Sequence, residues 1–214
     1  MKKEPKAKSF DYSKYQYNAF YAKYFKRILD IAVSLVSLPA VAVVGVPISI
    51  LIKAEDGGDV FFCSDRYGVD MKRFKMVKFR SMKMNAEDIR NSDGTTFNSA
   101  TDSRQTNIGR FLRKTSLDEL GQFWNVLKGD MSFVGPRPSP MGNEATYDDY
   151  IKIKFKVRPG ITGLNQALLR NTATLEERYH NDVFYAEHVC FSLDVTIIFL
   201  TLNSVLLQKN IYNS

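Results

Sequence analysis

The sequence predicts a helix-rich α+β fold, in which an N-terminal re-entrant membrane helix is followed by a small cytosolic domain with interfacial helices. Three observations predict it. Residues 31–52 carry no charge, residues 60–79 hold two short runs rich in β-forming side chains, and residues 116–128 place apolar side chains at helical spacing. One long apolar segment, a pair of strands and several helices together indicate a single membrane-attached α+β domain.

Size and charge limit the number of domains and the class of partner. The chain has 214 residues, of which 44% are hydrophobic, enough to bury one good core. We expect a basic and aromatic N-terminal segment, a re-entrant membrane helix and a domain at the membrane surface: residues 1–25, 26–53 and 54–214. The net charge of +7 suits an anionic membrane surface or a phosphorylated substrate. The sequence contains no zinc-finger spacing, helix-turn-helix signal or RNA-binding aromatic motif, so no nucleic-acid partner is expected.

The first 25 residues combine lysines with aromatic side chains such as Phe10, Tyr12, Tyr15 and Tyr24. Tyrosine is favoured where a membrane meets water, so this segment fits a position along the membrane interface. A solvated tail is the alternative.

The uncharged segment 31–52 would be about 33 Å long as a straight helix, enough to cross a bilayer core. Lysines and arginines lie on both sides of it, and the positive-inside rule places both flanks in the cytoplasm. A spanning helix cannot satisfy both flanks, whereas a broken helix that enters and leaves the same leaflet can. We therefore predict a re-entrant segment over a simple span, with its break at Pro39 or Pro47 and the freed backbone groups partly met by Ser34 or Ser37.

After the anchor, residues 60–62 and 74–79 are predicted to form two short strands around a turn at Arg66-Tyr67-Gly68. Lys78 and Arg80 are two positions apart on the second strand, so their side chains should point the same way. Two solvent-facing cations are one interpretation of this pair. Contact with phosphate groups is the other.

Three further features complete the pattern. Residues 83–107 are polar and predict a long loop of the kind that acts as a lid or binding loop. Residues 183–207 are apolar but interrupted by polar side chains, which favours a core or interfacial helix over a membrane span. Cys63 and Cys190 match no metal-ligand spacing, so both are expected to be reduced thiols.

Asp118 and Glu119 lie side by side at the start of a predicted helix of about three turns, with Ser116 as its N-cap and Gly129 as its terminator. Ser116-x-x-Glu119 is a capping box, and acidic residues suit the positive end of a helix, so a purely structural interpretation is available. The same arrangement supports chemistry, because two carboxylates can hold Mg²⁺ or supply a nucleophile while Arg113 binds a phosphate.

Four motifs go beyond these local patterns. The chain reads Ser-Leu-Asp-Glu-Leu-Gly-Gln from Ser116, Asn-Val-Leu-Lys-Gly-Asp-Met-Ser-Phe-Val-Gly-Pro-Arg-Pro over 125–138, Lys-Phe-Arg-Ser-Met over 78–82 and Arg-Pro-Gly-Ile-Thr-Gly over 158–163. In their order along the chain, these motifs closely resemble the bacterial sugar transferase family, the monotopic phosphoglycosyl transferases. The similarity runs from about residue 24 to about residue 205.

The resemblance implies roles for residues beyond the two carboxylates. The family positions that bind substrate and phosphate correspond to Lys78, Arg80, Arg113, Arg137, Arg158, Gln166, Arg170 and Asp182. Among these, Asp182 would pair with an active-site arginine. Over residues 151–158 the alternation of apolar and basic side chains suggests a strand, but the family has the end of a helix there, and we expect the helix.

The reaction that the resemblance implies is transfer of a sugar 1-phosphate from a UDP-sugar to a polyprenol phosphate, with release of UMP, as the first step of membrane-linked glycan assembly. Asp118 would attack the β-phosphorus and form a phosphosugar-aspartyl intermediate. Mg²⁺ held by Asp118 and Glu119 would neutralise charge on the phosphates. The chain would lie among the lipids of a bacterial inner membrane, with its catalytic domain facing the cytoplasm.

Two other functions stay open at this point. One is a membrane-anchored scaffold that binds such substrates without catalysis, and the other is a glycosyltransferase that releases UDP in place of UMP. The sequence identifies neither the sugar nor the glycan pathway, and it leaves open whether the chain is a monomer or a homodimer.

Overall fold

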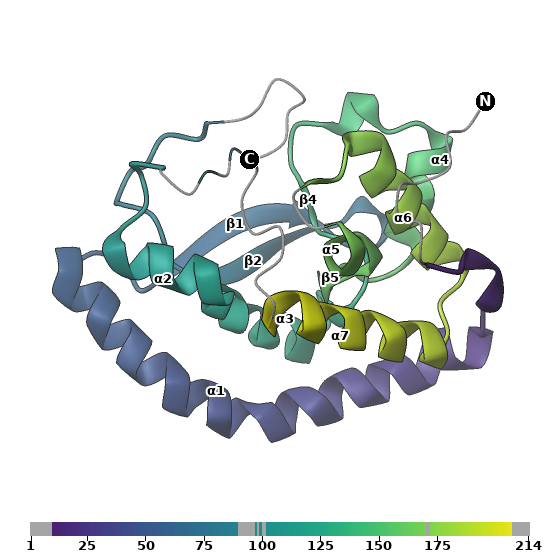
Figure 1. Cartoon of the computed structure of the whole chain (residues 1–214), viewed down its shortest axis with the longest axis horizontal. Coiled ribbons are helices and arrows are strands. Elements are labelled where there is room, and N and C mark those ends of the chain that lie inside the picture. Colours follow the sequence, from purple (N-terminus) through teal and green to yellow (C-terminus); the bar gives the residue numbers. More distant parts are fainter. Residues whose placement is uncertain (1–9, 90–96, 98, 100–101, 170–171, 207–214) are drawn as a thin grey trace.

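One long helix, α1 (Lys26–Asp56), underlies the rest of the protein. In the computed structural model, which describes residues 10–89, 97, 99, 102–169 and 172–206, the other elements lie above it in the view of Figure 1. Helix α1 continues a turn of π-helix, Tyr21–Phe25, and the two together are long and apolar enough to cross a membrane. This helix, two small sheets and many short helices confirm the predicted helix-rich α+β class.

The structure corrects one detail of the membrane helix. Pro39 and Pro47 both lie inside α1, and neither interrupts it. A proline removes one backbone hydrogen bond and displaces the preceding turn, which bends a helix whose flanking turns continue. Figure 1 shows α1 bent in its middle, so that both ends rise toward the domain. The buried hydroxyl of Ser34 has no hydrogen-bond partner among the described residues, whereas the Ser49 hydroxyl donates to the Gly45 carbonyl at 2.7 Å.

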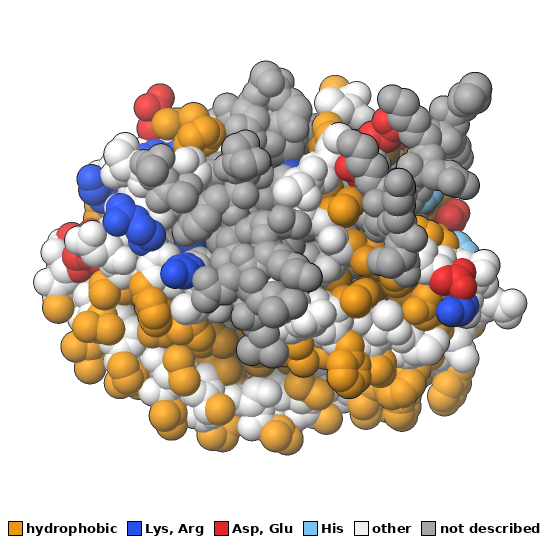
Figure 2. Space-filling model, viewed as in Figure 1, with side chains coloured by type: hydrophobic (Ala, Val, Ile, Leu, Met, Phe, Trp, Pro, Cys, Tyr) orange, Lys and Arg blue, Asp and Glu red, His pale blue; other side chains and the backbone are white. Residues whose placement is uncertain are grey.

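Most of α1 is not covered by the domain. Asp30, Ser34, Gly45, Ile48 and Ile52 are its buried residues. Large apolar side chains elsewhere on it, and on α7 (Phe191–Leu206), are exposed: Ile28, Val33, Leu35, Val36, Val43, Val46, Ile50, Phe191, Phe199 and Leu202. Figure 2 shows orange, hydrophobic side chains gathered along the lower edge of the molecule, where α1 lies in Figure 1. An apolar face of this extent is unfavourable in water and suits lipid.

The two predicted strands form an antiparallel hairpin. Strand β1 (Phe61–Tyr67) pairs with β2 (Arg73–Phe79), with Phe61 opposite Phe79 at the open end and a 3-10 turn, Val69–Met71, at the closed end. A short strand, β4 (Ser139–Pro140), adds to the far side of β1, which leaves β2 at the edge of the sheet. The hairpin therefore confirms the expected strands and extends the first of them. The turn was expected at Arg66-Tyr67-Gly68, but Arg66 and Tyr67 belong to β1 and the turn follows Gly68.

A second, two-stranded sheet brings the glycine-proline loops together. Strands β3 (Ser132–Val134) and β5 (Gly160–Thr162) are parallel neighbours although they lie far apart in the sequence. A Cβ atom on Gly160 would lie 2.1 Å from the backbone nitrogen of Gly135, so only glycine allows the two backbones to approach this closely. The segments at 134–138 and 158–163 thus form one rigid unit.

The remaining helices are short. In chain order they are η1 (Tyr12–Lys14), α2 (Asn107–Thr115), η4 (Leu117–Gly121), α3 (Gln122–Lys128), η5 (Glu144–Thr146), α4 (Asp149–Lys152), η6 (Ile153–Lys156), α5 (Leu164–Leu168), α6 (Leu175–Glu187) and α7. Elements α4 and η6 confirm the helix expected from the family over the strand suggested by alternation. Helix α2 was not predicted, and the apolar stretch 183–207 divides between the end of α6 and α7.

The described part of the N-terminal segment packs on the domain. The Tyr12 hydroxyl donates to the Asn181 side chain at 3.0 Å, and the Tyr15 hydroxyl donates to the Thr196 hydroxyl at 3.2 Å. Phe10 stacks on Tyr15 with the ring centroids 5.5 Å apart. Residues 10–15 are therefore held against α6 and α7 and are not a solvated tail, while residues 1–9 lie outside the described part of the chain.

Candidate active site

Asp118 and Glu119 lie on η4, a 3-10 turn between α2 and α3. The expected capping box is wrong. Ser116 has φ +59° and closes α2, since its backbone N–H bonds to the carbonyls of Leu112 and Arg113. Its side chain caps nothing in η4. A non-glycine residue in the left-handed region costs free energy, and such residues are common at functional sites. Gly129 does end α3, in the left-handed conformation expected of a terminator.

The η4 turn separates a polar side from an apolar side. Leu117 and Leu120 pack against the cluster formed by Ile48, Ile52, Phe79 and Leu112. Between them in the sequence are the two carboxylates, and Asp118 is buried. Because the leucines face the membrane helix and strand β2, the carboxylates face the body of the domain.

Asn125 on α3 fixes this turn to the edge of the sheet. Its side-chain oxygen accepts the Val77 N–H at 2.9 Å, and its side-chain nitrogen donates to the Lys75 carbonyl at 2.7 Å. Gly121 allows the close approach, because a Cβ there would lie 2.9 Å from the Val77 carbonyl oxygen. The side-chain amide of Asn125 thus makes hydrogen bonds to edge strand β2 that a neighbouring strand would otherwise make. Asn125 begins the motif over 125–138, but nothing in that motif predicted its contact with β2.

Three of the predicted cations surround the carboxylates. Lys78 donates to the Glu119 carboxylate at 2.7 Å, and the Arg137 guanidinium lies 4.0 Å from the same carboxylate. Burial raises the pKa of Asp118, the attraction of Lys78 lowers it, the charge of Glu119 raises it, and Arg113 and Arg137 lower it. All four charged neighbours therefore influence the pKa of Asp118.

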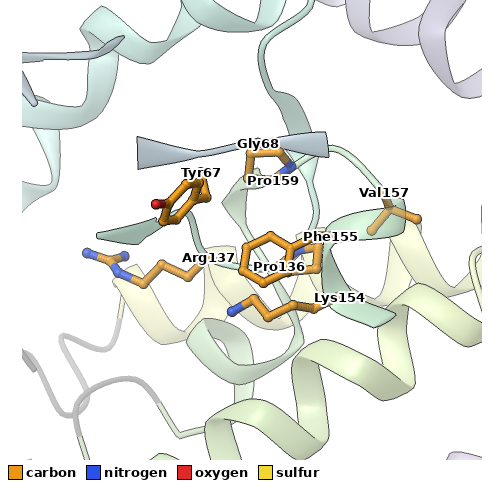
Figure 3. A pocket seen from close by; sticks show the side chains of 8 residues that line it. All are labelled: Tyr67, Gly68, Pro136, Arg137, Lys154, Phe155, Val157 and Pro159. Carbon is orange, nitrogen blue, oxygen red and sulfur yellow. The ribbon is translucent and has the colours of Figure 1, made fainter. Parts of the chain in front are cut away.

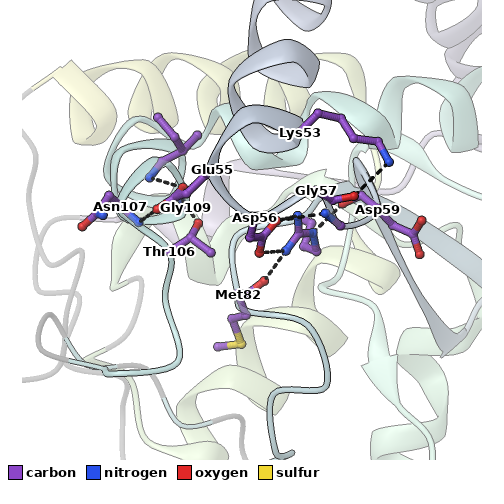
Figure 4. A network of polar contacts seen from close by, with 12 residues as sticks. Lys53, Glu55, Asp56, Gly57, Asp59, Met82, Thr106, Asn107 and Gly109 are labelled. Carbon is purple, nitrogen blue, oxygen red and sulfur yellow. Dashed lines mark hydrogen bonds and ion pairs between the residues drawn. The ribbon is translucent and has the colours of Figure 1, made fainter.

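Arg80 does not join this group, which corrects the expectation that it points with Lys78 toward phosphate. Its guanidinium forms two bonds to Asp56 at 2.5 and 2.6 Å, a third to the Met82 carbonyl at 3.3 Å, and a fourth to the Asp59 carbonyl. Figure 4 shows this network at the end of α1. A buried arginine requires a carboxylate partner, and Asp56 supplies one.

The same end of α1 also holds α2. The Glu55 carboxylate accepts the backbone N–H groups of Asn107 at 2.7 Å and Ile108 at 3.1 Å, at the N-terminus of that helix (Figure 4). Farther along α2, Arg113 donates to the Ser81 hydroxyl at 3.0 Å. The last turn of α1 thus positions two segments that lead to the candidate site. One is the chain just after β2, held through Arg80, and the other is the start of α2.

Two other predicted residues have different partners from those expected. Arg158 donates to the Gly129 carbonyl at 3.1 Å, at the opposite end of α3 from the carboxylates. Asp182 pairs with Lys154, not with an arginine side chain, although the Arg137 backbone N–H also bonds to it. Burial raises the pKa of Asp182, and Lys154 opposes the rise. Figure 3 shows Arg137 and Lys154 beside each other, with their charged ends pointing the same way.

Lys154 was not predicted as a site residue. It is 5% exposed and reaches Asp182 from η6, so it stabilises the loop that presents Arg137. In the sequence, Lys154 lies in a run that alternates apolar and basic residues. In a strand, this alternation would have placed Lys154 toward solvent. Gln166 on α5 keeps its place as a candidate, because its buried side-chain amide has no hydrogen-bond partner among the described residues. Arg170 lies outside the described residues.

The arrangement suits the binding and transfer of a phosphate group. A buried carboxylate is a potential nucleophile, and the lysine and arginines around it can hold an anion. No cluster of three or more metal-ligating side chains occurs among the described residues. Two adjacent carboxylates still fit Mg²⁺, since this ion is commonly held by one or two carboxylates together with the substrate's phosphates.

Comparison with known proteins places the sequence in context. Residues 21–208 match a family described as bacterial sugar transferase. The chain is 40% identical over 196 residues to a UDP-glucose:undecaprenyl-phosphate glucose-1-phosphate transferase of Klebsiella pneumoniae, covering 88% of this chain and 41% of that protein. It is 35% identical over 189 residues to a UDP-N-acetylgalactosamine-undecaprenyl-phosphate N-acetylgalactosaminephosphotransferase of Aeromonas hydrophila, covering 86% and 44%.

A third relative has a similar length. The chain is 37% identical over 186 residues to the uncharacterized sugar transferase EpsL of Bacillus subtilis, and the match covers 87% of this chain and 89% of EpsL. The chain therefore spans less than half of the first two relatives and nearly all of the third.

We expect Asn125→Ala to lower the free energy of unfolding by about 2–4 kcal/mol, because it leaves a backbone N–H and a carbonyl of β2 without partners. In a chain of this size that corresponds to a fall of roughly 5–15 °C in the melting temperature. Thermal unfolding of the detergent-solubilised protein measures it. Asn203→Ala on the exposed face of α7 is the matched control and should change stability by less than about 0.5 kcal/mol. Equal melting temperatures would contradict the positioning role.

Proposed function

The chain belongs to the bacterial sugar transferase family, and on that basis we propose that it transfers a sugar 1-phosphate from a UDP-sugar to undecaprenyl phosphate and releases UMP. The observation that carries this proposal is the buried Asp118, next to Glu119 and under the influence of Lys78, Arg113 and Arg137. The activities for which the Klebsiella and Aeromonas relatives are named support it.

In the first step an oxygen of Asp118 attacks the β-phosphorus of the UDP-sugar. The bond between that phosphorus and the bridging oxygen breaks, UMP leaves, and a phosphosugar-aspartyl intermediate remains. Burial suits Asp118 to this role, because a carboxylate with little hydration is a stronger nucleophile than one in water. Lys78 and Arg113 oppose the rise in the pKa of Asp118 that its burial causes.

Arg137 is the cation best placed to meet the substrate. Its side chain is 59% exposed, whereas that of Lys78 is 17% exposed and already bonded to Glu119. The prolines on either side of Arg137 and the hydrogen bond from its backbone to Asp182 hold the loop in one conformation. A preorganised guanidinium binds a diphosphate with little loss of conformational entropy.

Asp118 and Glu119 are the residues that would hold Mg²⁺. When bound, Mg²⁺ would neutralise negative charge on the phosphates of the substrate. Glu119 also accepts a hydrogen bond from Lys78, so a metal-binding role for this carboxylate would place Lys78 beside the same phosphates.

In the second step an oxygen of undecaprenyl phosphate attacks the phosphorus of the intermediate. The bond from phosphorus to Asp118 breaks, and the carboxylate is regenerated with a polyprenyl diphosphate sugar as product. The acceptor is a membrane lipid, so this step requires the site to lie at the membrane surface. The apolar edge formed by α1 and α7 supports that position (Figure 2).

We further propose that α1 is re-entrant and that the domain faces the cytoplasm. The bend in α1 brings both of its ends to the same side, where the domain binds them (Figure 1). The basic residues on both flanks favour the cytoplasmic side. These features suit a bacterial inner membrane in which UDP-sugars are cytoplasmic.

Asp118→Asn is expected to reduce UMP release at least about a thousandfold, because the amide is a poor nucleophile. The measurement follows nucleotide products from a panel of UDP-sugars with Mg²⁺ and undecaprenyl phosphate. Asp149→Asn, at a fully exposed carboxylate, is the control and should match wild type. The Asp118→Asn variant should melt no lower than wild type, since burial disfavours the charged form that the substitution removes. Retention of more than a few per cent of turnover, or UDP as the product, would refute the mechanism.

Lys78→Met is expected to move the acid limb of the pH-rate profile to higher pH. Asp118 must be ionised to attack, and its pKa is already raised by burial. Lys78 lowers that pKa, so its removal raises the pKa further and a higher pH is needed for the same fraction of carboxylate. UMP release as a function of pH measures the shift. Lys75→Met, on the exposed face of the same strand, should leave the profile unchanged, and identical profiles for both variants would contradict the assignment.

Re-entrant topology predicts that both flanks of α1 are inaccessible from outside an intact cell. We expect a membrane-impermeant maleimide to label neither Cys63, which is exposed, nor a cysteine introduced by Gln16→Cys in bacterial spheroplasts. Both should react after lysis. Labelling of either flank in intact spheroplasts would indicate a simple span.

A further inference from the structure

An apolar groove runs between the membrane helix and the candidate active site. One wall is a single face of α1, where the lining residues recur at helical spacing. The opposite wall comes from β1, β2, η4 and α3. The lining residues are Leu38, Val41, Ala42, Gly45, Val46, Ser49, Phe61, Val77, Phe79, Leu120, Gly121, Phe123 and Trp124. The groove has a volume of about 380 Å³, within the range of pockets that hold small ligands.

The side chains that line the groove favour a hydrocarbon ligand. Ser49 carries the only side-chain hydroxyl in the lining, and that hydroxyl already donates to the Gly45 carbonyl at 2.7 Å. The indole N–H of Trp124 is the one other polar side-chain group. A ligand with polar groups would lose hydration here without gaining hydrogen bonds, whereas an apolar chain would gain burial.

The groove and the carboxylates share the η4 turn. Leu120 and Gly121 line the groove and directly follow Asp118 and Glu119 in the sequence. Strand β2 also has one side toward the groove and one toward the carboxylates. Val77 lines the groove, while the next residue, Lys78, bonds to Glu119. The hydrocarbon side and the phosphate side are therefore separated by one turn of chain.

We propose that this groove binds the first isoprene units of the lipid acceptor, next to the phosphate that reacts at Asp118. The inference rests on the proposed function, which makes a polyprenyl phosphate the acceptor. In that lipid the hydrocarbon chain begins at the reacting phosphate, so an apolar path must start beside the nucleophile. A phospholipid places a glycerol between its phosphate and its acyl chains and has no such requirement.

Two glycines let the walls of the groove approach each other closely. A Cβ on Gly45 would lie 3.2 Å from the Phe79 ring, and a Cβ on Gly121 would lie 2.9 Å from the Val77 carbonyl oxygen. Ala42 is the lining residue where bulk can be added without strain, because it is exposed within α1. Ala40 is also exposed on α1 but does not line the groove, so Ala40→Leu is a matched control for Ala42→Leu.

Trp124 is the only tryptophan of the chain and lines the groove, so its fluorescence reports on the occupant. The probe is a polyprenyl phosphate brominated in its first isoprene units, added to the full chain in phospholipid nanodiscs. We expect saturable quenching that unlabelled polyprenyl phosphate reverses and added phospholipid does not. Ala42→Leu should weaken the apparent affinity about tenfold or more by filling the space of the chain, and Ala40→Leu should leave it unchanged.

Quenching that does not saturate, or that phospholipid reverses equally well, would overturn the proposal and identify the groove as a site for bulk lipid. Equal affinities for Ala42→Leu and wild type would also overturn it. Exchange of labelled UMP into the UDP-sugar without acceptor tests the proposed function separately. Ala42→Leu should retain this exchange, which also establishes that the variant is folded. Saturable, competed quenching with no exchange in wild type would refute the enzymatic proposal and leave the lipid groove standing.

Discussion

Charged contacts at both ends of α1 hold the membrane helix to the domain, and the geometry of the candidate site depends on them. At the first end, Asp194 of α7 accepts hydrogen bonds from Tyr21 at 2.6 Å and Lys26 at 2.5 Å. Removing one partner of such a buried ion pair typically costs about 3–5 kcal/mol, because the other charge is left uncompensated. At the second end, Asp56 binds Arg80. The helix is therefore fixed in register against the domain.

This fixed helix provides both environments that the proposed chemistry needs. Glu55 holds the start of α2, and α2 ends at Thr115, just before the cap residue Ser116 and the turn that carries Asp118. One side of that turn packs toward α1 and the hydrocarbon groove, and the other side carries the carboxylates. A water-soluble phosphate donor and a lipid acceptor can thus approach one nucleophile from different sides. The cost is a carboxylate held in a buried place, which Lys78 and two arginines offset.

Local patterns in the sequence were sufficient for much of the architecture. An uncharged run of the right length predicts α1, β-forming residues predict the hairpin, and Gly129 predicts the end of α3, because each depends on side chains close in sequence. The motifs around Asp118 and Arg137 identified the family, and the structure brings these two segments together. The capping box failed for a local reason. Ser116 closes the helix before it, and a four-residue pattern cannot distinguish the start of a helix from its end.

The sequence by itself determined which residues carry charge and which segments are apolar, and hence the fold class. The motifs that resemble the family pointed to the residues around Asp118. Only the tertiary structure decided the partners. Arg80 binds the end of the membrane helix, and Asp182 binds Lys154, because a buried charge takes whichever opposite charge the packing brings within reach. The groove beside Trp124 also arises only when α1 meets the sheet. Such contacts join residues far apart in the chain, so no local sequence pattern predicts them.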